Sequence, residues 1–182
     1  RDWGEGAWRW LADDRQRYYA DPFPFAHEGR LYLFCEEFPY ATGKGVLSVA
    51  ALDGRGAAET PRVAIEADCH LSYPLVFRHD GEIWMMPESS SGRRLDLYRA
   101  ERFPDRWTRD RTLIEGLEIS DATPFEANGR WWLTATVAEE GGSSWDCLSL
   151  FSAPGPLGPW TRCGEGPVLI DASCARPAGR IQ

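Results

Sequence analysis

Asp21-Pro22-Phe23-Pro24-Phe25 is the stretch that the rest of the sequence repeats in altered form. The copies follow at intervals of about fifty residues, as SYPLVF at residues 72–77, DATPF at 121–125 and ARPAG at 175–179. A fixed period of this size is typical of repeat architectures, in which every copy folds into the same supersecondary unit. The sequence therefore predicts several copies of one such unit in series.

A glycine and a short apolar segment follow each of the first three copies. These segments are GRLYLF at residues 29–34, GEIWMM at 81–86 and GRWWLT at 129–134. Short segments of alternating or wholly apolar character are separated by turn residues, and no longer stretch has helical spacing, so the pattern indicates an all-β protein. Four strands in a repeat of about fifty residues is the pattern of a β-propeller built from four-stranded antiparallel blades.

The repeat divides the chain into parts of one propeller domain or fragment, residues 1–182. We expect the end of a preceding blade at 1–20, blades at 21–68, 69–119 and 120–170, and the start of a next blade at 171–182. This amounts to about three and a half blades, whereas five blades need on the order of 250 residues. We therefore expect the native protein to continue at both ends. An open arc would expose strand edges, which favours self-association.

Three tryptophans hold matching places near the ends of successive units. Trp8, Trp107 and Trp160 each precede the next inner-strand motif by a similar number of residues. Matching positions of a repeat occupy matching environments. We therefore expect these tryptophans in outer strands, with their rings packed between neighbouring sheets.

The net charge of the chain limits the kinds of molecule that it can bind, and its length allows a folded domain. The 182 residues are enough for a domain with a real core. The formal net charge is −8, from 28 acidic and 20 basic residues, and there is no basic run. Such a chain is a poor candidate for binding nucleic acid or an anionic membrane surface, whereas a neutral sugar would not be repelled. An apolar run of about 18 residues, the length of a transmembrane helix, is absent.

The five cysteines are scattered through strand-like segments without Cys-x-x-Cys spacing. An odd number of such cysteines predicts free, buried thiols in a reducing compartment, which favours the cytoplasm. No signal peptide is visible, although the chain opens on Arg1 rather than Met, which suggests a missing native start. No two Cys or His residues stand at ligand spacing, so we expect no metal site built from them. The cysteines are Cys35, Cys69, Cys147, Cys163 and Cys174.

In a propeller the innermost strands line the axial channel, so matching positions of successive units face one shared site. The second strands also end near this channel. The inner-strand positions are Asp21, Tyr73, Asp121 and Arg176, and the second-strand positions are Glu36, Glu88 and Thr136.

These acids, together with nearby His70, Ser72 and Trp84, predict a polar pocket with aromatic walls. Carboxylates accept hydrogen bonds from sugar hydroxyls, and aromatic faces stack on the C–H faces of a sugar ring. A carbohydrate or glycoconjugate is therefore the expected partner. No cofactor is expected, although Ca²⁺ or another hard cation could bridge clustered carboxylates.

Each of these residues also has a structural interpretation. Asp21 and Asp121 stand at strand starts, where Asp often bonds nearby backbone amides. Arg176 could pair with Asp21 across the axis, and a single histidine such as His70 is more often a satisfied side chain than a base. Glu36 could mark a solvated strand edge. Both interpretations stay open at this point.

The sequence resembles two groups of propeller proteins. Ala20-Asp21-Pro22, the glycine–aromatic second strand and Pro87-Glu88 resemble the five-bladed propeller glycosidases of the arabinanase, xylosidase and β-fructosidase type. A closer resemblance is to the propeller domain at the N-terminus of glucosamine inositolphosphorylceramide transferases and related bacterial proteins. It is carried by HLSYP at 70–74, Pro87-Glu88, LYRA at 97–100 and ARPAG at 175–179.

The glycosidase resemblance implies roles for three acids. An Asp of the first blade serves that family as base or nucleophile, which corresponds to Asp21. A Glu serves as general acid, for which Glu88 is the candidate. The second blade here offers Tyr73 in place of an Asp, so the orienting role is vacant unless Asp121 fills it. Two carboxylates, one protonated and one ionised, are what glycosidic hydrolysis requires.

Two functions follow, and neither fold nor composition decides between them. The first is a carbohydrate-active enzyme of the glycoside hydrolase or glycosyl-transfer type, with Asp/Glu acid–base catalysis. The alternative is a non-catalytic domain that binds a sugar or glycolipid head group beside a separate transferase domain. A protein-interaction propeller is disfavoured because acids occupy the inward positions.

Overall fold

The structure is a computed structural model that describes residues 14–138 and 143–177. Its described residues form strands and one short 3₁₀ turn, Ser90–Gly92, and every strand pairing is antiparallel. The first sheet contains β1 (Arg17–His27), β2 (Arg30–Pro39), β3 (Val46–Leu52) and β4 (Arg62–Ile65), side by side in chain order.

The second and third sheets repeat this order. The second contains β5 (Ser72–His79), β6 (Glu82–Glu88), β7 (Arg94–Arg102) and β8 (Arg106–Glu115). The third contains β9 (Ile119–Ala127), β10 (Arg130–Val137), β11 (Cys147–Ala153), β12 (Thr161–Arg162) and β13 (Leu169–Ile170). Both β12 and β13 pair with β11, so its outer edge carries two short strands instead of one long strand.

The repeated glycine is the second residue of a two-residue hairpin turn in each sheet. In the turns Glu28-Gly29, Asp80-Gly81 and Asn128-Gly129, both residues have positive φ, between 48° and 80°. Turns of this kind match the right-handed twist of the two strands that they join. Gly29, Gly81 and Gly129 therefore fix the register of the first two strands of each sheet.

The core lies between facing sheets. One apolar cluster joins the first and second sheets and includes Phe34, Leu47, Val76 and Met85. The other joins the second and third sheets and includes Met86, Leu95, Ile119, Leu133 and Phe151. The sheets thus stack through wholly buried side chains, as neighbouring propeller blades do.

The predicted outer tryptophans contact these clusters. Trp107 lies in β8, and its ring meets Phe34 edge-on at a centroid distance of 5.9 Å. Trp160 is buried in the second cluster, directly before β12 instead of within it. Trp8 lies outside the described residues.

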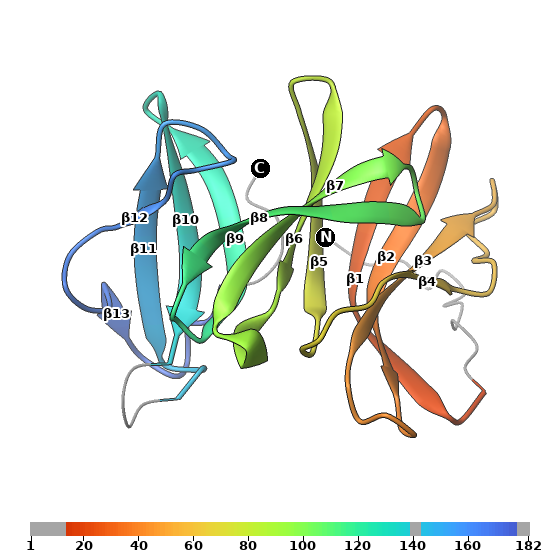
Figure 1. Cartoon of the computed structure of the whole chain (residues 1–182), viewed down its shortest axis with the longest axis horizontal. Helices are drawn as coiled ribbons and strands as arrows, with labels where there is room; N and C mark the ends of the chain where they lie inside the picture. Colours follow the sequence, from red (N-terminus) through yellow and green to blue (C-terminus); the bar gives the residue numbers. More distant parts are fainter. Residues whose placement is uncertain (1–13, 139–142, 178–182) are drawn as a thin grey trace, which may run out of the picture.

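Figure 1 shows β5 between β1 and β9, with β10 and β11 on the far side of β9 and with β2, β3 and β4 on the far side of β1. Each sheet thus runs from inner to outer strand along the chain. The prediction of an all-β propeller of four-stranded antiparallel blades is confirmed.

The inner strands share one irregularity. Their register with the neighbouring strand shifts between Ala20 and Phe23, between Ser72 and Leu75, and opposite Thr134–Thr136 in β9. Asp21, Tyr73 and Asp121 at these places have φ of 49°, 46° and 52°. A β-bulge of this kind bends the strand and re-aims a side chain. Three of the four inward positions named from the repeat are thus the bulge residues of β1, β5 and β9.

All five cysteines are free, as predicted. Cys35 and Cys147 are buried, Cys69 and Cys163 are half-buried, and Cys174 is exposed, so the prediction of buried thiols is met by two of the five and is wrong for Cys174. Cys174 lies in the turn after β13, and its backbone N–H donates to the Asp171 carbonyl at 3.1 Å. Within 14–138 and 143–177, no helix has the length and apolar character needed to cross a membrane.

Candidate functional site

Carboxylates of one sheet accept hydrogen bonds from the bulge of the next inner strand. The Asp21 carboxylate accepts a hydrogen bond from the backbone N–H of Tyr73 at 3.0 Å. The Glu88 carboxylate, at the end of β6, accepts one from the backbone N–H of Asp121 at 3.1 Å. The bulges expose these N–H groups because their residues leave the regular ladder. An acid of one sheet therefore holds the inner strand of the following sheet.

Asp121 is only 5% exposed and pairs with the Arg176 guanidinium through Nε. The same guanidinium lies 4.2 Å from the ring centroid of Trp145. Arg176 therefore bridges a buried carboxylate and an aromatic ring. The sequence left open a pairing of Arg176 with Asp21, but the structure pairs Arg176 with Asp121. The charge of Asp21 has only a smaller effect, at longer range, on the pKa of Arg176.

Tyr73 occupies the inner-strand position where the first and third sheets carry Asp. Its ring is buried, and its hydroxyl lies 2.9 Å from the hydroxyl of Thr123 in β9. Tyr73 thus spans from the second sheet to the third. At this position the second sheet contributes an uncharged bridge between sheets instead of a carboxylate.

Glu36 and His70 form a second pair beside the bulges. His70 Nε2 lies 3.2 Å from Glu36 Oε1, and His70 Nδ1 accepts a hydrogen bond from the backbone N–H of Gly45 at 3.0 Å. The acceptor role of Nδ1 places the ring proton on Nε2, toward Glu36. The hydrogen bond to Glu36 raises the pKa of His70, although partial burial opposes the shift. Glu36 is therefore a buried partner and not a solvated edge residue.

Burial and mutual repulsion change the acidity of two carboxyls. Burial raises the pKa of Glu88 to about 7, and the neighbouring charge of Asp121 adds to this rise. Burial also raises the pKa of Asp21, with further contributions from the charges of Glu36 and Asp121 and an opposing effect of the Tyr73 N–H. Such mutual effects require the groups to lie close together. We refer to Asp21, Glu36, Glu88 and Asp121, with Arg176 and His70, as the acidic cluster.

Two further predicted residues are placed differently. Ser72 is buried and pairs with Glu88 across β5 and β6, so it lies beside the cluster. Trp84 lies four residues from Glu88 along β6, which is about 13 Å in an extended strand. Its indole N–H donates to the backbone carbonyl of His79 at 3.3 Å, near the hairpin turn. The structure therefore does not bring Trp84 to the acidic cluster.

Sequence reasoning missed Trp145 and Ser120. Trp145 is 60% exposed and contacts Arg176, so an aromatic ring does stand at the cluster, but it comes from the segment before β11. The signal in the sequence was a lone tryptophan after a Gly/Ser-rich run. Ser120 directly precedes the β9 bulge, and its hydroxyl interacts with Glu88.

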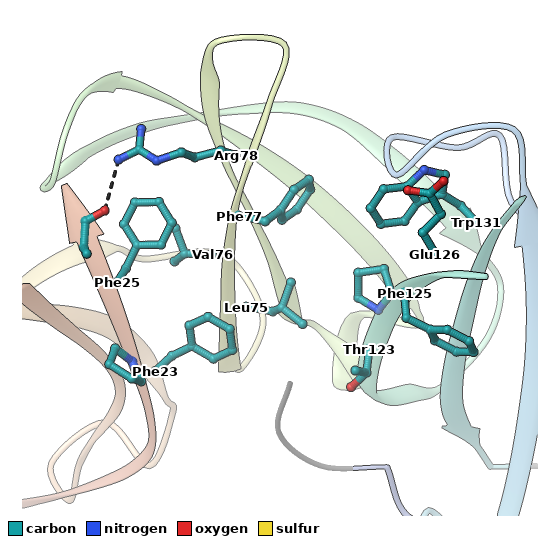
Figure 2. A pocket seen from close by; sticks show the side chains of 13 residues that line it. Phe23, Phe25, Leu75, Val76, Phe77, Arg78, Thr123, Phe125, Glu126 and Trp131 are labelled. Carbon is teal, nitrogen blue, oxygen red and sulfur yellow. Dashed lines mark hydrogen bonds between the residues drawn. The ribbon is translucent and has the colours of Figure 1, made fainter. Parts of the chain in front are cut away.

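A separate apolar cavity of about 480 Å³ lies between β1, β5 and β9. Figure 2 shows side chains of all three inner strands around it, with Arg78 at one side donating to the carbonyl of Ala26 at 3.0 Å. The lining includes Phe23, Phe25, Leu75, Phe77, Phe125 and Trp131. The cavity residues follow the bulges along the strands, so the cavity and the acidic cluster are distinct.

Thr123 marks the border between the two. It lines the cavity, and its hydroxyl contacts Tyr73, the bulge residue of β5. The titratable side chains gather on the side of the bulges, whereas the cavity is lined by aromatic and aliphatic side chains apart from Arg78, Thr123 and Glu126.

A metal ion finds no set of ligands in the cluster. In the described part of the chain, no group of three or more His, Cys, Asp and Glu side chains is placed to hold a metal ion. The carboxylates instead face backbone N–H groups, Arg176 and His70. The structure therefore gives no support to the expectation of a bridging Ca²⁺.

The fold defines the class of protein as a β-propeller like those of glycoside hydrolases. A family 117 glycoside hydrolase of Zobellia galactanivorans matches 90% of this chain with a TM-score of 0.63 and 16% identity, over 60% of its own chain. The exo-β-1,3-galactanase of Phanerochaete chrysosporium matches 81% with a TM-score of 0.64 and 14% identity, over 36% of its own chain. At these identities the likeness concerns the fold alone.

The chain belongs to the family described as glucosamine inositolphosphorylceramide transferase 1, N-terminal, whose model matches residues 12–181. The transferase of that name from Oryza sativa subsp. japonica is 36% identical over 168 residues, and that from Arabidopsis thaliana is 33% identical over 157 residues. These matches cover 90% and 83% of this chain. The chain spans only 22% and 20% of the length of these two relatives.

Proposed function

We propose that this propeller binds the sugar part of a glycoconjugate through the acidic cluster. The observation that carries the proposal is the meeting of carboxylates from three sheets, Asp21, Glu88 and Asp121, at the bulges of the inner strands. Partly buried carboxylates accept hydrogen bonds from sugar hydroxyls, and Arg176 and His70 supply donors beside them. Such a mixed set of convergent polar groups suits a polyol.

Charge narrows the class of sugar. The cluster contains four acids and only two basic side chains, and the chain carries a net charge of −8. A phosphate or carboxylate group on the ligand would be repelled, whereas an ammonium group would be attracted. The relatives are named as transferases of glucosamine, whose amino group is such a cation. We therefore propose a neutral or amino sugar as the ligand, bound next to a transferase region in longer proteins of the family.

Calorimetric titration with glucosamine, glucose and glucose 6-phosphate tests this proposal. We expect the order of affinity to be glucosamine, then glucose, then glucose 6-phosphate. Asp121→Asn should weaken the binding of glucosamine more than the binding of glucose, because the substitution removes a buried negative charge. Glu126→Gln, an exposed acid on the same strand, should change neither. Absence of binding for all three sugars, or tightest binding of the phosphate, would overturn the proposal.

Catalysis is a second candidate, and the acidity of Glu88 favours it. A carboxyl with a pKa of about 7 is half protonated near neutral pH and could act as general acid, opposite Asp21 as base. In its support, the pKa of Glu88 lies well above that of an ordinary Glu. Against it, the Asp21 carboxylate is engaged by the Tyr73 amide, and Tyr73 replaces an inner-strand acid.

Aryl glycosides separate catalysis from binding. If Glu88 acts as general acid, kcat/KM should fall as pH rises above about 7, and Glu88→Gln should abolish turnover while sugar binding persists. A protein that binds sugars but turns over none of a panel of aryl glycosides between pH 5 and 8 would be a binding domain.

A further inference from the structure

Trp145 is an exposed aromatic ring that is nevertheless held in place. It is 60% exposed, the largest side chain with this degree of exposure among the described residues. Its backbone N–H donates to Ser143 Oγ at 3.1 Å, and the Arg176 guanidinium lies over the ring at 4.2 Å. Attraction between the cation and the aromatic ring favours one orientation of the exposed indole.

The contact ties the ring to the acidic cluster. Arg176 pairs at the same time with Asp121, which is buried and whose backbone N–H donates to Glu88. Only one side chain therefore separates the indole from the carboxylates. A guanidinium covers only one face of a planar ring, and the 60% exposure of Trp145 leaves much of its remaining surface accessible to a ligand.

We propose that Trp145 is a stacking platform for the pyranose ring that the acidic cluster binds, and that Arg176 holds the platform in position. This inference rests on the proposed sugar binding. A pyranose has polar edges and at least one face made of C–H groups. The cluster would take the hydroxyl or ammonium groups at the edge, while the indole covers the C–H face and removes apolar surface from water.

The platform makes a prediction about ligand shape. Glucosamine is a closed ring with a C–H face, whereas glucosaminitol carries similar polar groups on an open chain without such a face. The cluster alone would bind the two with similar contacts. A stacking platform should favour the closed ring by roughly threefold to tenfold, the range expected for one aromatic contact.

Calorimetry with both ligands on four proteins tests the platform. The wild type should prefer methyl glucosaminide over glucosaminitol, Trp145→Ala should lose this preference, and Trp145→Phe should keep most of it. Trp132→Ala is the matched control, because Arg130 lies over Trp132 at 5.8 Å but this pair stands near the hairpin turn of β9 and β10. It should keep the full preference.

The indole signal gives a readout that does not depend on affinity. In a ¹H–¹⁵N spectrum, the indole N–H peak that disappears in Trp145→Phe belongs to Trp145, and it should shift when methyl glucosaminide is added. If Trp145→Ala fails to fold, this shift and Trp145→Phe decide the question. A wild-type preference that survives in Trp145→Ala, or an unmoved peak at saturation, would overturn the platform but leave sugar binding intact. No binding by the wild type would overturn both.

Discussion

Glu88 is the side chain whose ionisation depends most directly on the assembled propeller. Its carboxylate is half-buried at the end of β6 and faces the bulge of β9 with the acid Asp121. Neither feature exists in an unfolded chain, where an ordinary Glu titrates near 4.5. Folding therefore raises the affinity of Glu88 for its proton.

The sign of the pH effect on stability follows from this shift. Between pH 4.5 and about 7 the folded state keeps the Glu88 proton that the unfolded state has lost, so the free energy of unfolding falls as pH rises. Glu88→Gln removes this contribution. We expect the free energy of unfolding of the variant to rise, relative to that of the wild type, by on the order of 3 kcal/mol between pH 4 and pH 8. Urea melts at both pH values measure this difference, and parallel curves would contradict it.

Gly45 is required by the close approach of two chain segments. A Cβ at this position would lie 2.6 Å from the Leu71 carbonyl oxygen and 2.7 Å from His70 Cε1. Gly45→Ala should therefore cost about 1–3 kcal/mol through overpacking and displace His70 from Glu36. Gly54→Ala, where a Cβ would meet nothing within 4 Å, is the control. Chemical denaturation gives both values, and equal stabilities would show that the segments can separate cheaply.

The inner-strand positions that form the bulges were predictable from the sequence, and the contact of Arg176 with an aromatic ring was not. Asp21, Tyr73 and Asp121 follow from the repeat alone, because a propeller converts register into a ring. The contact between Trp145 and Arg176 joins two irregular segments with no periodic relation, so no pattern could indicate it. The prediction that Trp84 lies at the site was wrong, because Trp84 stands near the hairpin turn of β6 and not at the end of the strand, where Glu88 lies.

Among the strands, β8 shows how an outer element is tied to the neighbouring sheet. Trp107 reaches the first sheet through Phe34, and it also meets Phe103 at 6.3 Å. Its indole N–H donates to the Pro104 carbonyl at 2.8 Å. One side chain therefore fixes both the turn before β8 and the contact between two sheets.

Removal of this ring should loosen the two sheets from each other. Trp107→Ala is expected to cost about 3 kcal/mol, the lower end of the range for a large aromatic in a core, because the residue is half-buried. Trp145→Ala, a truncation of the same size at an exposed position, should cost little. Denaturant melts compare the two variants, and a loss below about 1 kcal/mol for Trp107→Ala would show that the ring is not part of the core.

The period of the repeat predicted the first three strands of each sheet well, but it failed for the outer edge of the third. The sequence contains Trp160-Thr161 in register with Trp107-Thr108, which predicted one fourth strand. The structure has two short strands, β12 and β13, on either side of a segment with Gly164, Gly166 and Pro167. Proline and glycine interrupt the hydrogen bonding between strands. The repeated inner-strand motif does not indicate where the chain pairs with β11 again.

Apolar side chains are exposed at the outer edge of the third sheet, at and beside β13. In the part of the chain that the structure describes, β13 pairs only with β11, and the consecutive residues Val168, Leu169 and Ile170 are exposed. An edge strand with apolar side chains is a site for association between chains. We therefore expect this chain, studied by itself, to self-associate as its concentration rises.

Ile170→Lys should weaken this association, because Ile170 is 69% exposed and a charge at an edge strand opposes pairing. Thr161→Lys adds the same charge at an exposed position of β12 and should have a smaller effect. Sedimentation velocity over a hundredfold range of concentration measures the change. Equal association of both variants and the wild type would place the contact elsewhere.

The hydrogen bonds between carboxylates and bulges have a spectroscopic consequence. The amide protons of Tyr73 and Asp121 point at side chains of the preceding sheet instead of at a neighbouring strand. The chemical shift of an amide proton changes when the oxygen that accepts its hydrogen bond gains or loses charge. The backbone resonances of these two residues should therefore follow the titration of Asp21 and Glu88, so that the charge of each acid can be recorded from the sheet next to it without a probe or a substitution.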